Sequence, residues 1–352
     1  MTGSTAAADL ALGPATRLLW RGPDTVHLEL GGRAVVVEGL PVPVLRRLAS
    51  PVEPESAPQS VPEQVAHALA TLAEAGYLWP RSPEPVDDRL AVPHPQFAGE
   101  LAALAVRHGA GAAEVFSARR HAIVEIRGTS RVAAHLGAVL AAAGVGRVSC
   151  RVEGSAKLAG TTPGGLTPAD EGGVLSAAAE AAIRRAAPSV DTAPLPLDER
   201  ADLTVFALDG PLPDERVPSL HARNAAYLVV TLGVDFGVVG PLVLPGLTSC
   251  VRCADLHRRD RDPAWSALAV QLTVERRYGP ASPVTAATVV AGLAGHQALA
   301  FLDGDEPDCL DATLEARLPD YRIRRRSWPP HPECGCTDAS PEPDVGHNGH
   351  RD

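Results

Sequence analysis

Apolar and polar residues follow two different periods along the first eighty residues. Two extended patches in 17–30 and a β-branched run at 33–40 indicate short strands, and the Gly31-Gly32 pair between them is typical of a hairpin turn. Two short helices are expected to follow. In the second, apolar residues recur at helical spacing, with Ser60 as the predicted N-cap and Gly76 as the stop.

A hairpin followed by helices predicts a small winged-helix-like module in residues 1–80. Its second helix carries few basic residues, which argues against a DNA-binding role. The exposed hairpin edge, Arg33–Leu40, could instead accept an added peptide strand beside the helix Val61–Tyr77. Residues 81–120 are predicted to be a Pro-rich acidic linker and a helix.

From Ala122 onward, short apolar runs alternate with helical patterns. This order predicts a parallel sheet covered on both faces, and therefore a doubly wound, Rossmann-like α/β domain over 121–336. A long apolar helix is expected at Val284–Leu302, and the polar, Pro-rich residues 337–352 are predicted to be a disordered tail. The strands are predicted at 122–126, 147–152, 203–208 and 227–232, and the helices between them at 131–143 and 174–187.

Composition narrows the classes of function. The chain has 352 residues, 45% of them hydrophobic, and a formal net charge of −10, which makes a broad nucleic-acid-binding face an unlikely feature. Every apolar run is interrupted before the roughly 18–20 residues of a membrane helix, and the start lacks the basic segment of a secretory signal. We therefore expect a cytoplasmic protein without nucleic-acid or membrane partners.

The cysteines carry the strongest local signal. Cys250 and Cys253 form a CxxC pair, and Cys334 and Cys336 form a CxC pair about eighty residues later. Two closely spaced pairs on turns can supply the four tetrahedral thiolates of a structural zinc site, although a redox CxxC is the alternative. The two other cysteines, Cys150 and Cys309, are expected to be small buried apolar residues.

A second signal lies between the first predicted strand of the α/β domain and its first helix. The turn Gly128-Thr129-Ser130-Arg131 stands where nucleotide-binding α/β domains keep their phosphate loop, but only one glycine of GxGxxG is present. The acidic residue that would bind a ribose hydroxyl is also displaced, since no carboxylate occurs before Glu153. These departures argue against a nicotinamide or flavin enzyme.

Several segments together resemble the ThiF/MoeB/HesA superfamily, which shares its adenylyltransferase fold with ubiquitin-activating enzymes. The stretch 253–265 is similar to actinobacterial ThiF-like proteins that carry a leader-peptide-recognition module, related to the cyclodehydratase components of azoline-forming peptide pathways. The resemblance covers about residues 15–336. The segments that carry it are Ala141–Val148, Asp170–Gly172, Gly240–Cys253, Cys253–Trp265 and His331–Cys336.

Superfamily members use Mg-ATP to adenylate the C-terminal carboxylate of a carrier protein. This sequence lacks their GxGGxG loop and their Asn-x-x-Arg element. Arg151 and Val152 stand where the acidic residue after the second strand is expected, and Leu175 stands where the lysine is expected. The resemblance thus implies a degenerate nucleotide pocket around Gly128, Ser130, Arg131 and Asp170, and leaves open whether the chain is an enzyme.

Two functions remain. In the first, the chain binds the leader of a precursor peptide and presents it to a YcaO-type cyclodehydratase partner, with zinc as a structural cofactor. In the alternative, it is an active ATP-dependent adenylyltransferase in which Arg131, Asp170 and the single lysine, Lys157, serve phosphate and magnesium. A homodimer through the α/β domain is a further implied partnership. The basic cluster at 322–326 is interpreted as a solvated strand or a partner contact.

Overall fold

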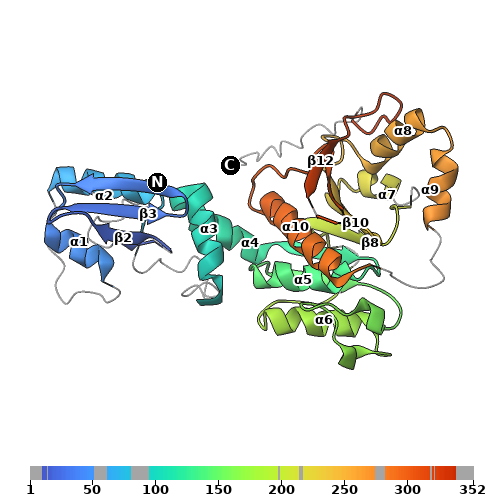
Figure 1. Cartoon of the computed structure of the whole chain (residues 1–352), viewed down its shortest axis with the longest axis horizontal. Helices are drawn as coiled ribbons and strands as arrows, with labels where there is room; N and C mark the ends of the chain where they lie inside the picture. The colour runs from blue at the N-terminus through green and yellow to red at the C-terminus, as the bar shows by residue number, and fades with distance from the viewer. Residues whose placement is uncertain are drawn as a thin grey trace, which may run out of the picture. The chain divides into compact units, whose positions relative to one another are not determined.

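The computed structural model describes residues 10–13, 15–50, 62–80, 95–196, 199–213, 217–273, 282–317, 319–320 and 322–337. These residues form two compact units (Figure 1). The first comprises Met1–His121 with Ala142–Gly144, and the second comprises Ala122–Ala141 with Val145–Asp352. The predicted linker at 81–94 and the predicted tail after Thr337 lie outside the described residues.

The first unit contains a three-stranded antiparallel sheet in the order β2-β3-β4. Polar and apolar residues alternate along β3, so Val26, Leu28 and Leu30 share one face and are buried against the helices. The hairpin predicted at Gly31-Gly32 is present, with Gly31 at a φ of 59°. The strands are β1 (Leu10–Leu12), β2 (Arg17–Trp20), β3 (Thr25–Leu30), β4 (Arg33–Glu38) and β5 (Leu78–Pro80), of which β1 pairs with β5.

Two helices pack against this sheet, α1 (Val42–Ala49) and α2 (Glu63–Glu74). The predicted N-cap of α2 is wrong: Pro62 occupies that position without a side-chain cap, while Ser60 lies outside the described residues. Proline suits a helix start because it has no N–H to leave unpaired. Helices α3 (Ala98–His108) and α4 (Ala112–His121), with short 3-10 turns at Pro95–Phe97 and Gly109–Gly111, complete the same core.

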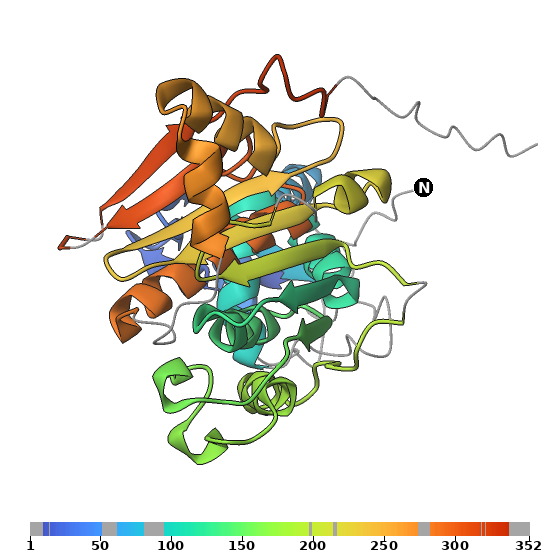
Figure 2. The same ribbon diagram turned by 90° about the vertical axis from the view of Figure 1, so that its right-hand side faces the viewer.

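The second unit is built on a seven-stranded sheet in the order β12-β11-β10-β9-β8-β6-β7. Strands β6 (Ile123–Arg127), β7 (Arg147–Arg151), β8 (Leu203–Leu208) and β9 (Tyr227–Leu232) are parallel, as predicted. The sheet continues beyond these predicted strands, because three further strands, which the predicted alternation of strands and helices did not include, add to it in antiparallel orientation. These are β10 (Phe236–Val243), β11 (Ala312–Arg317) and β12 (Ile323–Ser327). Figure 2 shows these strands, coloured from green through yellow to red-orange, in one twisted sheet.

Residues of β8 and β9 face two different cores in alternation. Val205 and Leu228 join the larger core with helices α5 (Val132–Ala142), α6 (Leu175–Ala186) and α10 (Val284–Leu302). Phe206 and Tyr227 join a second core with α7 (Val217–Ala222) and α8 (Val251–Arg261). The sheet is therefore covered on both faces. Helix α9 (Trp265–Thr273) and the 3-10 turns Leu158–Gly160 and Pro168–Asp170 complete the described elements.

Helix α10 corrects one expectation from the sequence. The helix has 19 residues and is long and apolar enough, by length and composition, to cross a membrane. From the sequence, every apolar run is expected to be too short for this. Half of its most apolar window is buried, and Ala287, Val290 and Ala294 are fully inaccessible within the larger core. In this structure α10 is thus a core helix of the sheet.

Candidate functional site

The four cysteines of the two predicted pairs converge at one point of the second unit. All four Sγ atoms lie within 4.8 Å of one another. The closest are Cys250 with Cys334 at 3.5 Å and Cys253 with Cys336 at 3.4 Å. In a tetrahedral zinc site with Zn–S bonds of about 2.3 Å, sulfur atoms lie about 3.8 Å apart. The donor set and its spacing therefore fit a closed, structural zinc site.

Local structure positions each pair. Cys250 is the N-cap of α8 and Cys253 lies in its first turn, where the positive end of the helix favours thiolates. The second pair lies in a turn on the segment Trp328–Cys336, which we call the C-terminal strap. Cys250 and Cys253 are buried, whereas Cys334 and Cys336 are partly exposed.

The strap is also held to α8 by polar contacts. The ring of His331 hydrogen-bonds to Asp260 at 2.8 Å, and Glu333 pairs with Arg259 at 2.8 Å. Trp328 is only 1% exposed, and three guanidinium groups lie 4.7–5.6 Å from its ring centroid. These belong to Arg258, Arg261 and Arg326. The strap is therefore held by the buried Trp328, by the hydrogen bond of the buried His331 and by one partly exposed ion pair.

The pKa values of the thiols depend on their mutual contacts. Hydrogen bonding from the Cys250 thiol, with a backbone hydrogen bond from His331, lowers the pKa of Cys253 to about 4. Burial raises the pKa of Cys334, and raises the pKa of Cys336 to about 12. Zinc binds thiolates, so binding of the metal must release the protons that these thiols carry.

A cavity of about 470 Å³ lies at the carboxyl end of the parallel strands of the second unit. Such crevices are the usual ligand sites of open α/β sheets. Its wall includes the predicted turn Gly128–Arg131. Gly128 has a φ of 109°, and a Cβ at this position would lie 2.2 Å from the carbonyl oxygen of Ala207. Only glycine allows this close approach, which explains its place in the turn.

The other predicted pocket residues have different surroundings. The Ser130 hydroxyl lines the cavity, is buried and has no hydrogen-bond partner among the described residues. Arg131 also lines the cavity, but its guanidinium donates to the carbonyls of Thr161, at 2.7 and 2.9 Å, and Ser282, at 2.5 Å. Three of its donors are therefore committed to backbone groups.

Asp170 is not brought to this cavity. It belongs to a 3-10 turn, where it accepts hydrogen bonds from the amide and hydroxyl of Thr167 at 2.7 and 2.8 Å. The backbone hydrogen bond, followed by the hydroxyl, lowers the pKa of Asp170 below its ordinary value. Its carboxylate thus caps its own turn.

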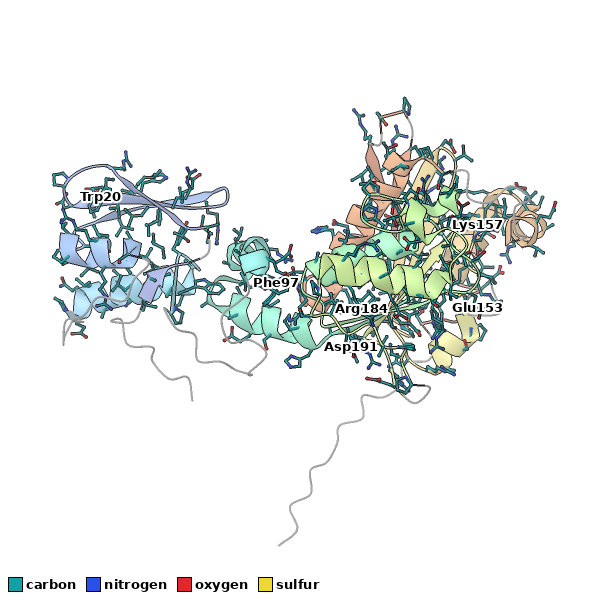
Figure 3. All side chains as sticks on the ribbon, turned by 90° about the horizontal axis from the view of Figure 1, so that it is seen from below. Trp20, Phe97, Glu153, Lys157, Arg184 and Asp191 are labelled. Atoms are coloured by element: carbon teal, nitrogen blue, oxygen red, sulfur yellow. The ribbon has the colours of Figure 1, made fainter. Side chains whose placement is uncertain are left out.

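Two acidic residues that sequence reasoning did not place here do line the cavity. Glu153 follows the end of β7, and Asp209 directly follows β8. Lys157 lines the same cavity, and Figure 3 shows Glu153 and Lys157 at one end of the α/β unit. Their position after predicted parallel strands could have indicated this, because the residues that follow parallel strands gather at one edge of a sheet. The cavity is therefore lined by two acidic residues and by Lys157, whose ammonium group has no hydrogen-bond or ion-pair partner among the described residues.

No protein-family model matches the sequence, and no curated protein matches it. Solved structures do match the fold. Crystal structures of E. coli MccB with succinimide and with ATP superimpose with TM-scores of 0.66 and 0.63, at 19% and 17% identity. Both cover 94% of this chain and 99–100% of their own. A crystal structure of PaaA matches with a TM-score of 0.61 at 15% identity, covering 90% of this chain and 99% of PaaA. The predicted ThiF-like fold is thus confirmed.

Proposed function

We propose that this ThiF-fold protein serves peptide-modifying biosynthesis as a zinc-stabilised peptide-binding component. In this proposal it binds the leader of a precursor peptide and presents it to a YcaO-type cyclodehydratase partner in the cytoplasm. Its own cavity does not activate a carboxylate. MccB has been crystallised with MccA, which is N-formylated in one of the structures. These complexes support a peptide as the partner of this fold.

The observation that carries the proposal is that Arg131 donates its hydrogen bonds to backbone carbonyls. Adenylate chemistry needs preorganised positive charge or a metal around the reacting phosphates. Here the guanidinium nearest the Gly128 turn donates to the carbonyls of Thr161 and Ser282 instead. The turn itself lacks the glycines that let backbone amides surround a phosphate.

The peptide is assigned to the exposed strand β4 of the first unit. Among the described strands, β4 pairs with β3 alone, so its outer edge is open to an added strand. Val35 and Val37 of β4 are partly buried, while Val36 between them is 42% exposed. A library of displayed peptides selected on the full chain would test this, with Val36→Asn as the edge variant and Leu247→Ala in the second unit as the control. We expect selected peptides to bind the control normally and the edge variant more weakly.

A second candidate function is an active adenylyltransferase, which the acidic residues and Lys157 of the cavity favour. Glu153 is positioned to accept hydrogen bonds from a ribose, and Asp209 to hold magnesium, if a nucleotide enters. The MccB structure with ATP supports nucleotide binding by this fold. A homodimer remains a proposal for either function.

Calorimetric titration of the zinc-loaded protein with Mg-ATP separates the two functions. We expect no heat of binding up to about 1 mM ATP. Micromolar binding that is lost in Lys157→Gln and Glu153→Gln, but kept in Arg184→Gln on the surface of α6, would overturn the proposal and establish a nucleotide site. Arg131→Ala is a poor probe here, because it also breaks the contacts with Thr161 and Ser282.

A further inference from the structure

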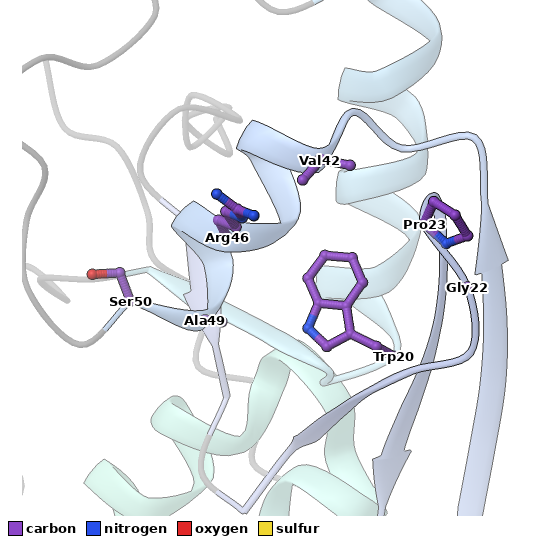
Figure 4. A pocket seen from close by; sticks show the side chains of 7 residues that line it. All are labelled: Trp20, Gly22, Pro23, Val42, Arg46, Ala49 and Ser50. Carbon is purple, nitrogen blue, oxygen red and sulfur yellow. The ribbon is translucent and has the colours of Figure 1, made fainter.

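The first unit contains a second open edge, on the side of its sheet opposite β4. There, a cavity of about 550 Å³ lies between strand β2 and helix α1. Trp20 of β2 and Pro23 of the following turn form one wall, while Val42, Arg46 and Ala49 of α1 form the other (Figure 4). Residues at positions 42, 46 and 49 share one helix face. The cavity is thus a groove between an edge strand and a single helix face.

Two side chains that line this groove, Trp20 and Arg46, can only donate hydrogen bonds. Trp20 is 49% exposed, although tryptophan is the largest apolar residue. Neither its indole N–H nor the exposed guanidinium of Arg46 has a hydrogen bond or ion pair with any described residue. Indole and guanidinium groups donate but do not accept. A ligand that satisfies both donors therefore supplies an acceptor such as a carboxylate, together with an apolar group for the walls.

Charge and backbone geometry narrow the ligand further. Helix α1 has two arginines in its last turn, Arg46 and Arg47, and no acidic residue in its first turn. Among the described strands β2 pairs only with β3, so the backbone N–H and C=O groups of its outer edge are open. An extended peptide could pair with this edge while its alternate side chains enter the groove.

We infer that the groove between β2 and α1 binds an extended acidic peptide segment, with an apolar side chain against Trp20 and a carboxylate on Arg46. This inference rests on the proposed function and adds to it a second contact, separate from the β4 edge. The precursor peptide is held at two opposite edges of one small sheet. Its acidic, apolar segment is selected at the β2 edge.

Fluorescence anisotropy with the full chain tests the groove directly. The probe is a fluorescein-labelled peptide of about 12 residues in which Leu and Glu alternate, and its counterpart has Gln in place of Glu. We expect Trp20→Ala to weaken binding of the Leu/Glu peptide about 30-fold, as tryptophan anchors do. Arg46→Gln should weaken that peptide about tenfold and leave the Leu/Gln peptide unchanged. Leu247→Ala, in the second unit, should bind both peptides normally.

Other results separate this inference from the proposed function. Wild-type affinity in both Trp20→Ala and Arg46→Gln overturns the inference. If Val36→Asn alone weakens binding, the peptide lies on β4, so the proposed function stands and the second site does not exist. If the Leu/Glu peptide does not bind the unmodified chain at about 1 mM, the inference is also overturned. The proposed function is tested independently, by the selection of displayed peptides. Both substituted residues are exposed, and circular dichroism verifies that each variant is folded.

Discussion

Removal of zinc should release the C-terminal strap while leaving the sheet folded. Ordering the nine residues from Trp328 to Cys336 costs about 10 kcal/mol of conformational entropy. Burying Trp328, which is 1% exposed, returns about 5 kcal/mol at roughly 25 cal/mol per Å². The ion pair of Arg259 with Glu333 is partly exposed and contributes little. The deficit of about 5 kcal/mol is within what a structural zinc ion supplies.

Tryptophan fluorescence measures this release. Chelation should shift the emission to longer wavelength and increase acrylamide quenching as Trp328 becomes solvated, and Cys336→Ser should behave in the same way. Trp328→Phe serves as the control, because its spectrum should no longer respond to chelation. Far-UV circular dichroism should change little, since the larger core contains none of the four cysteines. A protected Trp328 in protein proven to be metal-free would refute the reasoning and show that packing alone holds the strap.

Three further changes have definite expected results. Gly128→Ala should destabilise the fold by about 2 kcal/mol or more in urea unfolding, because its Cβ would meet the Ala207 carbonyl at a φ of 109°; wild-type stability would contradict this. Burial raises the pKa of Cys150 and Cys309 to about 12, so iodoacetamide should label neither at neutral pH in the native protein and both in urea, as read by mass spectrometry. Burial lowers the pKa of His135, so its contribution to stability is complete above about pH 6.5 and falls in more acidic solution; His135→Gln should flatten thermal stability between about pH 5 and 7, and an unchanged pH profile would exclude this role.

Local patterns predicted the parallel half of the sheet closely. The strands at 203–208 and 227–232 have the predicted bounds, because continuous apolar runs mark strands buried on both faces. The antiparallel half has no such signal. Strand β10 contains Gly240-Pro241, and β12 consists largely of exposed arginines, so neither resembles a buried strand. The basic cluster forms the exposed strand β12, which agrees with the strand that was predicted there as either solvated or a partner contact.

The four-cysteine cluster could be found from spacing because short cysteine pairs are a local signal. The cavity residues could not be assigned in the same way. Arg131 donates to partners 30 and 151 positions away, so the use of its guanidinium is a property of the tertiary structure. Glu153 and Asp209 reach the same cavity from two different strands. Residue type indicates a possible charge, but only the fold shows what that charge faces.

The separation of the two cysteine pairs also affects the order in which the molecule is assembled. Cys250 and Cys334, whose sulfur atoms are neighbours, are 84 positions apart in the chain. During synthesis the first pair emerges long before the second, and between them come α10 and the antiparallel strands β11 and β12. A ribosome-bound chain therefore offers zinc only half a coordination shell. A zinc ion that needs all four thiols is therefore bound late in biogenesis. The metal content of a preparation would then report the fraction of chains that were synthesised through Cys336 as well as the fraction that are folded.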